Sequence, residues 1–352
     1  MNISIACLKF KKGGGSERYV LDIINGFYQQ NIKCNVYSTY FDSQLAEYNK
    51  INPLKANLSF IPKKLRLPFL SNFIKKHKQS DEIILSMTHT YNDITICGGQ
   101  HKGYLRAINK KPTLVDRFKI ANEQKCFNTA RLIIAHSNLM KDELVELYNL
   151  DPKKIKVIYP PVDTERFHTI SDSERDKLRK KLGFLENEII YLFPSTGHYR
   201  KGFQELKQFF EKTDLPIKLV VVGSPVEETK NIRYLGYRDD MPELYRAADF
   251  TIMASIYEPF GLVGIESILS GTPIIFSKNM ACLETLNDDL NLSFIKNDKF
   301  SLENVIAQSI KYKESNKHRI LDPYKILNYN PTLTNHIHKL KESIISLANN
   351  NQ

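Results

Sequence analysis

The chain has 352 residues, a length typical of two domains, and its 42% hydrophobic and 25% charged residues exclude a disordered or fibrous protein. We find no basic leader with a cleavage site and no apolar run near the roughly 18 residues of a spanning helix. We therefore expect neither secretion nor a membrane-spanning segment. The formal net charge of +11 lies in the first half, because residues 1–167 hold 26 Lys and Arg against 15 Asp and Glu, whereas residues 168–352 hold 24 of each. Unless the lysines only reflect the base composition of the genome, this asymmetry indicates an anionic partner: nucleic acid, a membrane surface or a phosphorylated substrate.

The first half is predicted to alternate strands with helices. An apolar strand over 3–8 is followed by glycines 13–15 and by a helix with apolar residues at helical spacing, namely Val20, Ile23, Ile24 and Phe27. Further strands are expected over 33–38, 83–86 and 131–135, and a helix over 139–148. Strands separated by helices predict a parallel sheet with helices on both faces.

The second half repeats this alternation. Strands are expected over 189–193, 218–222, 250–254, 273–276 and 292–295, and helices over 203–210, 241–248 and 264–270. Because consecutive prolines stop both helices and strands, the segment 159–172 separates a first domain, 1–165, from a second, 166–320. The remaining segment, 321–352, ends in a helix whose apolar stripe needs a surface to cover. Both domains are therefore doubly wound α/β, and two such sheets facing each other make a cleft for a ligand.

The five cysteines are widely spaced and odd in number, and no C-x-x-C occurs. They indicate neither a disulfide framework nor a zinc site. A reducing compartment fits this pattern, so we expect a cytoplasmic protein.

The strongest chemical signal is the segment 258–266, which reads EPFGLVGIE between an expected strand and an expected helix. Its backbone N–H groups and the start of the helix suit a phosphate. Glu258 is expected to accept hydrogen bonds from sugar hydroxyls, and Glu266 to bind a ribose diol, since carboxylates chelate vicinal hydroxyls. The alternative is that the two acidic residues only complement the helix dipole.

This segment, followed by Ser270-Gly271-Thr272-Pro273-Ile274-Ile275, resembles the E-x7-E signature of the retaining glycosyltransferase family 4. Other segments resemble the same family, in the same order, over roughly residues 1 to 290: 13–17 (GGGSE), 135–137 (AHS), 156–163 (KVIYPPVD), 199–202 (YRKG) and 236–249 (GYRDDMPELYRAAD). The resemblance implies the GT-B architecture, with two Rossmann-like domains facing a cleft. It also implies that the second domain holds most of a nucleotide sugar, and that segment 321–352 packs back on the first domain.

The resemblance assigns roles to single residues. Lys201 is expected to lie against the donor diphosphate with Arg200 beside it, where fixed cations stabilise the charge of the leaving group. The remaining residues expected at the donor are Gly14, Gly15, Tyr237, Glu258, Gly261, Leu262, Val263 and Glu266. No D-x-D triplet is placed to hold a divalent ion, so we expect a site without metal or cofactor, and a UDP- or GDP-linked sugar as substrate. The glycines 13–15 do not form a dinucleotide fingerprint, which disfavours NAD.

A histidine of the first domain is expected near the reacting carbon. His101 is favoured, because its G-G-x-H-x-x-Y-L context resembles lipopolysaccharide-core members of the family and flanking glycines suit a loop that reaches into a cleft. His89 is the alternative, and either histidine is otherwise structural. With Glu258 and Lys201, His101 completes the expected catalytic set.

Segment 61–80 carries six basic residues and no acidic one, with leucines and phenylalanines between them. This composition suits the face of an anionic membrane. The expected membrane or acceptor surface consists of Lys63, Lys64, Arg66, Lys75, Lys76 and Lys78. An RNA-binding patch has similar composition, but no RNA-binding motif accompanies it, and a plain solvated helix remains the simpler alternative.

The sequence therefore predicts a retaining hexosyltransferase that moves a sugar from a nucleoside diphosphate to a glycan hydroxyl. The acceptor is expected to be linked to a lipid, as in lipopolysaccharide or similar surface glycans, so that the protein associates with the inner face of the membrane and binds no nucleic acid. Two alternatives stay open: a nucleotide-sugar 2-epimerase of the same architecture, and a non-catalytic protein that binds nucleic acid.

Overall fold

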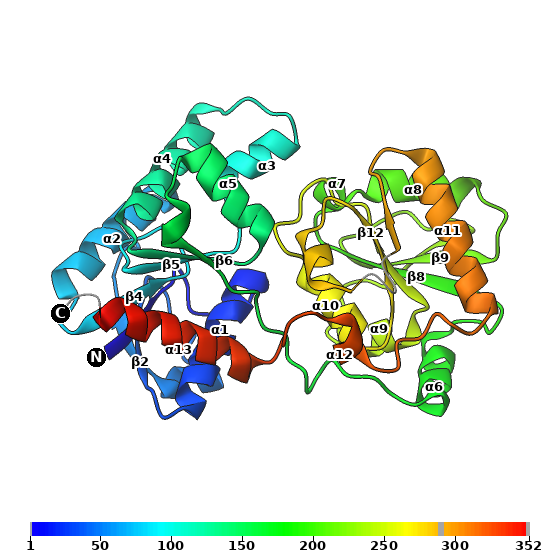
Figure 1. Ribbon diagram of the computed structural model, residues 1–352, viewed down its shortest axis with the longest axis horizontal. Coiled ribbons are helices and arrows are strands. Elements are labelled where there is room, and N and C mark those ends of the chain that lie inside the picture. The colour runs from blue at the N-terminus through cyan, green and yellow to red at the C-terminus, as the bar shows by residue number, and fades with distance from the viewer. Residues whose placement is uncertain (1, 288–291, 350–352) are drawn as a thin grey trace. The chain divides into compact units, whose positions relative to one another are not determined.

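The computed structural model describes residues 2–287 and 292–349. The chain divides into two compact units, unit 1 with residues 1–161 and 332–352 and unit 2 with residues 162–331 (Figure 1). The units therefore meet at 161/162, where the sequence analysis expected 165/166. Residues 321–331 of the predicted C-terminal segment belong to unit 2. Residue 1 of the first predicted domain and residues 350–352 of the last segment lie outside the described residues.

Unit 1 is built on a parallel sheet in the order β3-β2-β1-β4-β5-β6-β7. Its strands are β1 (Asn2–Ala6), β2 (Cys34–Ser38), β3 (Ile51–Lys55), β4 (Glu82–Ser86), β5 (Ile94–Cys97), β6 (Leu132–Ala135) and β7 (Ile155–Val157). Its α-helices are α1 (Gly15–Gln29), α2 (Arg66–His77), α3 (His101–Ala107), α4 (Leu114–Thr129), α5 (Asn138–Tyr148) and α13 (Leu333–Asn349), and 3-10 turns are η1 (Ala46–Lys50), η2 (Lys63–Leu65) and η3 (Pro152–Lys154).

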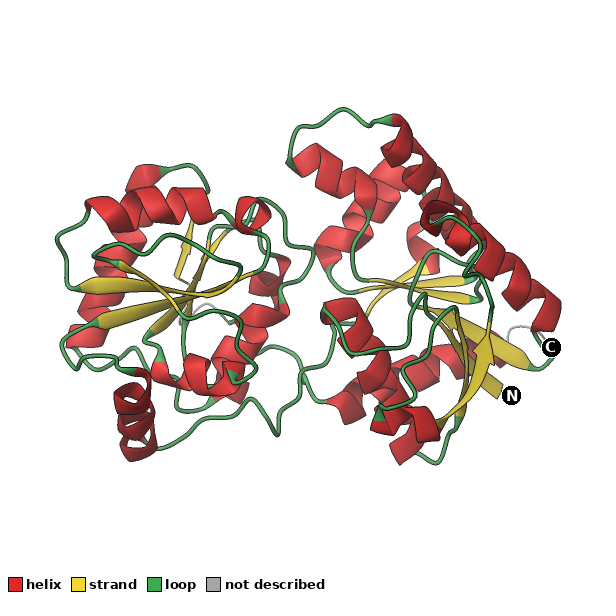
Figure 2. Cartoon of the chain, turned by 180° about the vertical axis from the view of Figure 1, so that it is seen from behind, coloured by secondary structure: helices red, strands yellow, loops and turns green. Residues whose placement is uncertain are grey.

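Unit 2 is built on a second parallel sheet, in the order β10-β9-β8-β11-β12-β13. Its strands are β8 (Ile189–Ser195), β9 (Ile217–Gly223), β10 (Ile232–Tyr234), β11 (Phe250–Met253), β12 (Ile274–Ser277) and β13 (Leu292–Phe294). Its helices are α6 (Asp172–Leu182), α7 (His198–Lys201), α8 (Phe203–Lys212), α9 (Met241–Ala247), α10 (Leu262–Leu269), α11 (Lys299–Glu314), α12 (Pro323–Ile326) and the 3-10 turn η4 (Ala281–Thr285). In each unit the strands run between layers of helices (Figure 2).

Both sheets reverse their strand order at one point. In unit 1 the reversal lies between β1 and β4, and in unit 2 between β8 and β11. All these strands are parallel, so the loops that follow them leave the sheet at the same edge. Ligands of open α/β sheets bind at such a switch point, outside the carboxyl ends of the strands.

The terminal helix α13 packs on α1 within unit 1 (Figure 1). Its stripe of Ile337, Leu340 and Ile344 is buried in the same core as β1 and α1. The contact is close at Gly26, where an added Cβ would lie 2.4 Å from Ile337 Cγ1. Unit 1 thus gains part of its core from the far end of the chain, and this supplies the apolar surface that the terminal helix requires.

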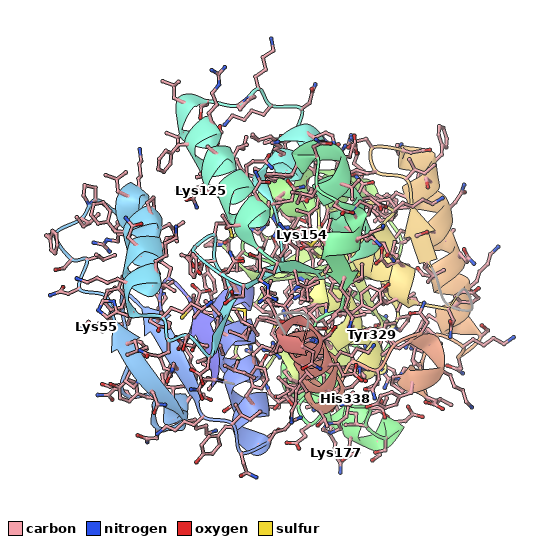
Figure 3. The ribbon with its side chains drawn as sticks, turned by 60° about the vertical axis from the view of Figure 1, so that its left-hand side comes forward. Lys55, Lys125, Lys154, Lys177, Tyr329 and His338 are labelled. Carbon is pink, nitrogen blue, oxygen red and sulfur yellow. The ribbon has the colours of Figure 1, made fainter. Side chains whose placement is uncertain are left out.

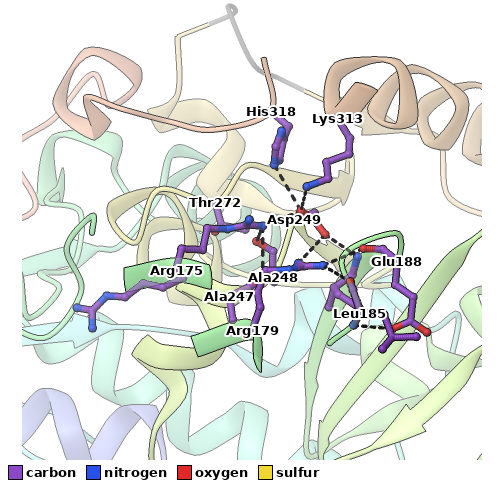
Figure 4. A network of polar contacts seen from close by, with 12 residues as sticks. Arg175, Arg179, Leu185, Glu188, Ala247, Ala248, Asp249, Thr272, Lys313 and His318 are labelled. Atoms are coloured by element: carbon purple, nitrogen blue, oxygen red, sulfur yellow. Dashed lines mark hydrogen bonds and ion pairs between the residues drawn. The ribbon is translucent and has the colours of Figure 1, made fainter. Parts of the chain in front are cut away.

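A buried ion cluster around Asp249 holds three elements of unit 2 together (Figure 4). The carboxylate lies directly before β11, and its two oxygens pair with Arg175 at 2.6 Å and Arg179 at 3.0 Å, both from α6. Lys313 of α11 lies 2.9 Å away and His318 3.4 Å away. Burial by itself raises the pKa of Asp249, but His318, the two arginines and Lys313 together hold it well below its usual range.

The five cysteines are free and buried, as a chain without a disulfide framework requires. Desolvation raises the pKa of these thiols, for example that of Cys126 to about 11. In the described part of the chain, every helix is too short or too polar to cross a bilayer.

Candidate active site

Two loops meet at the switch point of unit 2. The first leaves β8 and contains α7, and the second leaves β11 and leads into α10. The backbone N–H of Ile256 donates to the carbonyl of Arg200 at 2.8 Å, which joins the loops. Gly202 has φ +76°, and a Cβ there would lie 1.8 Å from the carbonyl oxygen of Ala254. Only glycine permits this approach, which brings residues 200 and 201 beside the E-x7-E segment.

Lys201 lies within this junction. Its ammonium donates to the carbonyl of Pro194 at 2.9 Å. Burial lowers the pKa of Lys201, Glu258 acts against this shift, Arg200 adds to it, and Glu266 again opposes it. The four charged residues predicted at the donor therefore lie near enough to one another to interact electrostatically. Because the surroundings are desolvated, a cation here interacts more strongly with an anion than it does in water.

Glu258 and Arg200 form an ion pair. Arg200 Nη1 lies 2.6 Å from Glu258 Oε2 and also donates to the carbonyl of Tyr257 at 3.1 Å. Within the described residues Glu258 Oε1 has no hydrogen-bond partner, so this oxygen is able to accept a bond from a ligand. Arg200 therefore orients the carboxylate while one of its oxygens stays available.

Gly261 precedes helix α10 with φ +99°, a left-handed conformation that favours glycine. No side chain caps the helix start, so the N–H groups of its first turn, around Leu262 and Val263, are not satisfied by a capping side chain. Glu266 is buried one turn further along α10 and accepts a hydrogen bond from Tyr245 at 3.2 Å. A helix start beside two cations is an arrangement that suits an anionic ligand.

Tyr237 lies in the loop after β10 and is 71% exposed, with its hydroxyl 3.3 Å from Ser224 Oγ.

The sequence analysis did not single out His198, although it lies three residues before Lys201. Its Nε2 donates to the carbonyl of Ser224 at 3.1 Å, and its Nδ1 lies 2.9 Å from Ser195 Oγ. His198 thus ties the end of β8 to the segment after β9. Its signal in the sequence was its position directly before the YRKG segment, in the loop that follows a buried strand.

In unit 1, Gly14 precedes α1 and Gly15 begins it. A Cβ at Gly15 would meet no atom within 4 Å, and at Gly14 only Glu17, at 3.8 Å. The packing of unit 1 therefore does not require glycine at these two positions. The open space around them is what the expected approach of a ligand to the backbone needs.

The two candidate histidines differ in their surroundings. His101 begins α3, and its Nε2 lies 2.7 Å from Asp116, whose pKa is held well below its usual range by Thr113 and His101. His89 follows β4 and lines a cavity, and its Nε2 lies 3.9 Å from Glu123 Oε1. Burial lowers the pKa of His89, and Glu123 acts against this shift. The structure therefore holds His101 against Asp116 and places His89 at the switch point of unit 1.

The basic segment forms η2 and α2. Arg66 donates to the carbonyls of Ile61 and Ser59, and Lys78 pairs with Asp93 at 2.6 Å, so these two of the six expected residues are engaged within the protein. Lys63, Lys64, Lys75 and Lys76 are exposed. Phe69 lies among them on α2 and is 44% exposed. Four of the six expected basic residues thus face solvent, beside an exposed apolar group.

A doubly wound sheet whose switch point carries two cations, two carboxylates and an uncapped helix start is typical of α/β proteins and suits a phosphorylated ligand. Comparisons with known proteins narrow this class. Residues 13–166 match the family described as Glycosyltransferase Family 4, and residues 174–322 match that described as Glycosyl transferases group 1. A protein of Burkholderia thailandensis named probable transglycosylase is 35% identical over 347 residues, which cover 97% of this chain and 96% of the relative. The chain therefore belongs to glycosyltransferase family 4, and the protein is a glycosyltransferase.

Other similarities extend over most of the chain. The mannosylfructose-phosphate synthase of Agrobacterium fabrum is 25% identical, over 74% of this chain and 70% of that one. Among solved structures, Anabaena HepE in complex with UDP and glucose has a TM-score of 0.75 at 18% identity, over 98% of this chain and 100% of HepE. WaaG, a glycosyltransferase involved in lipopolysaccharide biosynthesis, has a TM-score of 0.74 at 16% identity, over 99% of this chain and 98% of WaaG. These structures confirm the expected α/β class and the GT-B architecture of two parallel sheets.

Proposed function

We propose that this glycosyltransferase moves a hexosyl group from a nucleoside-diphosphate sugar to a hydroxyl of a glycan, with retention at the anomeric carbon and without a metal ion. The observation that carries the proposal is the junction of Arg200, Lys201, Glu258 and Glu266 at the switch point of unit 2, beside the start of α10. A diphosphate fits the cations and the helix start, and hydroxyl groups fit the carboxylates. The expected metal-free site and retention remain part of the proposal.

The bond from the anomeric carbon to the diphosphate oxygen breaks first in this mechanism, and negative charge accumulates on the diphosphate. Lys201 and the N–H groups at the start of α10 stabilise that charge. The acceptor hydroxyl then attacks the same face of the oxocarbenium-like sugar and passes its proton to the departing diphosphate. Glu258, oriented by Arg200, binds the sugar hydroxyls, and Glu266 binds the ribose. This route preserves the anomeric configuration and needs no carboxylate nucleophile.

We expect a nucleoside diphosphate to stabilise the protein, because a ligand bound only to the folded state raises the melting temperature. UDP is the first candidate, since HepE was solved with UDP and with UDP-glucose. Thermal shifts with UDP, GDP and ADP, with and without EDTA, measure both the nucleotide and the need for a metal. Stabilisation that disappears with EDTA would contradict the metal-free site. Turnover of the nucleotide sugar to an epimer without any acceptor would instead support a 2-epimerase.

We propose further that the acceptor is linked to a lipid and that the basic face of η2 and α2 docks on an anionic membrane, as in lipopolysaccharide or similar glycan synthesis at the inner face. Exposed Lys63, Lys64, Lys75 and Lys76 supply the charge.

We expect the protein to sediment with phosphatidylglycerol vesicles but not with phosphatidylcholine vesicles, and to be released by salt. Changing these four lysines to glutamate should abolish sedimentation, whereas the same change at four exposed lysines of unit 2, Lys180, Lys212, Lys230 and Lys299, should not. Equal losses in the two variants would contradict this docking face.

A further inference from the structure

A groove in unit 1 is not used by the donor site. It has a volume of about 550 Å³ and lies between the segment 63–67 and the first turns of α4. Its walls are mainly apolar and include Leu8, Leu65, Leu67, Leu114, Val115 and Phe118. A second cavity, of about 310 Å³ between α2 and α4, shares Phe118 with it and includes Lys125, labelled in Figure 3. The volume of the first cavity is in the range that holds a small organic ligand.

The apolar walls of this groove are unusually open to solvent. Leu65 is 41% exposed, Val115 43% and Leu114 81%. The exposure of Leu114 does not come from a frayed helix end, because a complete capping box of Thr113 and Asp116 fixes the start of α4. Clustered large apolar groups that remain exposed on a well-defined surface mark a place where another molecule binds.

Positive charge surrounds the same groove. Lys63, Lys64 and Lys119 line it; Glu123 lines it as well but lies beside His89, and among the described residues no ion pair joins an acidic side chain to the three lysines. The occupant therefore combines an extended apolar part with an anionic group. An extended peptide fits poorly, because the segment 63–67 and α4 offer no sheet edge to satisfy its backbone. A second copy of this chain docked through the same face fits poorly as well, because it would bring an equally basic surface to the groove.

The inner end of the groove lies at the switch point of the unit 1 sheet. Leu8 follows β1 and His89 follows β4, and these neighbouring strands are the pair at which the strand order reverses. This edge is where a ligand of an open α/β sheet is expected to present its reactive part. A hydrocarbon chain in the groove would therefore extend away from the position where unit 1 is expected to bind its substrate.

We propose that this groove binds the hydrocarbon chain of a lipid phosphate, with Lys63, Lys64 and Lys119 on the phosphate, and that this lipid carries the acceptor glycan. The inference rests on the proposed function and makes it more specific. It names the acceptor as a glycan on a phosphate-bearing lipid. One hydrocarbon chain of this lipid lies in the groove of unit 1, and the membrane surface also contacts the protein.

Fluorescence can test this directly, because the chain contains no tryptophan. A Phe118→Trp variant places a single indole in the groove wall. Leu114→Trp is a second reporter for the case in which Phe118→Trp lowers the melting temperature of the protein. We expect saturable quenching or enhancement with farnesyl phosphate below its micelle concentration, roughly tenfold weaker binding of farnesol, and no response to inorganic phosphate. An equal response to inorganic phosphate would show a phosphate site only, and no saturable response to farnesyl phosphate would show that the groove binds no lipid chain. Either result overturns the proposal.

A matched pair of variants locates the binding. Leu65→Glu, made in the reporter background, is expected to weaken farnesyl phosphate binding roughly tenfold or more, because it removes an apolar contact and introduces a charge. Ile345→Glu is the control, since Ile345 lies on α13 and is 42% exposed, nearly the same as Leu65 at 41%. Equal affinities in the two variants would overturn the proposal. So would a reporter signal that follows protein concentration and disappears on dilution, because it would identify a second copy as the occupant.

Nucleotide binding separates this inference from the proposed function. We expect Leu65→Glu to keep the melting shift with UDP, because the donor residues lie in unit 2, and to lose transfer to a lipid-linked acceptor. If the parent protein shifts with UDP and transfers sugar to soluble glycans but does not bind farnesyl phosphate, only the lipid inference fails. If no nucleoside diphosphate shifts the parent protein, the proposed function itself fails.

Discussion

Replacing Lys201 by alanine is expected to lower kcat by roughly two to three orders of magnitude, the loss typical of one fixed group that stabilises transition-state charge. Replacing Glu258 by alanine should cause a comparable loss, because the sugar loses its carboxylate partner and Arg200 loses its ion pair at 2.6 Å. The measurement is the steady-state rate of release of the nucleoside diphosphate. Near-normal turnover in both variants would contradict the proposed site.

The controls for this prediction separate charge from packing. Lys201→Met keeps the volume of the side chain and removes the charge, so it should be as slow as Lys201→Ala while its melting temperature stays near that of the parent. Lys207→Ala changes a lysine on the neighbouring helix α8 that pairs with Glu211 at 3.5 Å, and it should keep full activity. If Lys201→Met were active, Lys201 would act through packing and not through its charge.

Replacing Asp249 by alanine is expected to cost about 3–5 kcal/mol of the free energy of unfolding, because it leaves two buried arginines without their counter-ion. Chemical denaturation monitored by circular dichroism measures this loss. Asp214→Ala is the control, since Asp214 is fully exposed and its partner Lys230 lies 3.6 Å away at the surface. A loss no larger than that of the control would contradict the structural role of the cluster.

The same cluster predicts a dependence on pH. The pKa of Asp249 is lower in the folded protein than the unfolded value of about 3.9. Its stabilising contribution is therefore complete above the unfolded pKa and is lost as the pH falls from there towards the folded value. The difference in unfolding free energy between the parent and Asp249→Ala should shrink on acidification below about pH 4. If the difference in unfolding free energy between the parent and Asp249→Ala grew as the pH fell, the result would contradict this prediction.

Much of the fold follows from local pattern. The strands expected over 33–38, 83–86, 189–193 and 250–254 correspond to β2, β4, β8 and β11, since each is a compact apolar run that a doubly covered sheet buries on both faces. The sequence analysis did not predict β3, β5, β7 and β10. β3 reads INPLK at a sheet edge, and the other three have only three or four residues, too few for a periodic signal. The sequence analysis also did not predict the long helix α4, because its apolar residues do not form a single stripe along the helix.

By itself, the sequence determined the α/β class and the E-x7-E segment, because these depend on residue types at fixed spacing along one stretch of chain, and the resemblance to a family led to the prediction for Lys201. Only the tertiary structure decided which distant segments meet. It joined Arg200 to Glu258 across 58 positions, placed α13 on α1, and tied His101 to Asp116 while leaving His89 at the switch point. It also assembled the apolar groove from η2, α2 and α4. Such contacts depend on strand order and helix packing, which bring together residues that share no local pattern.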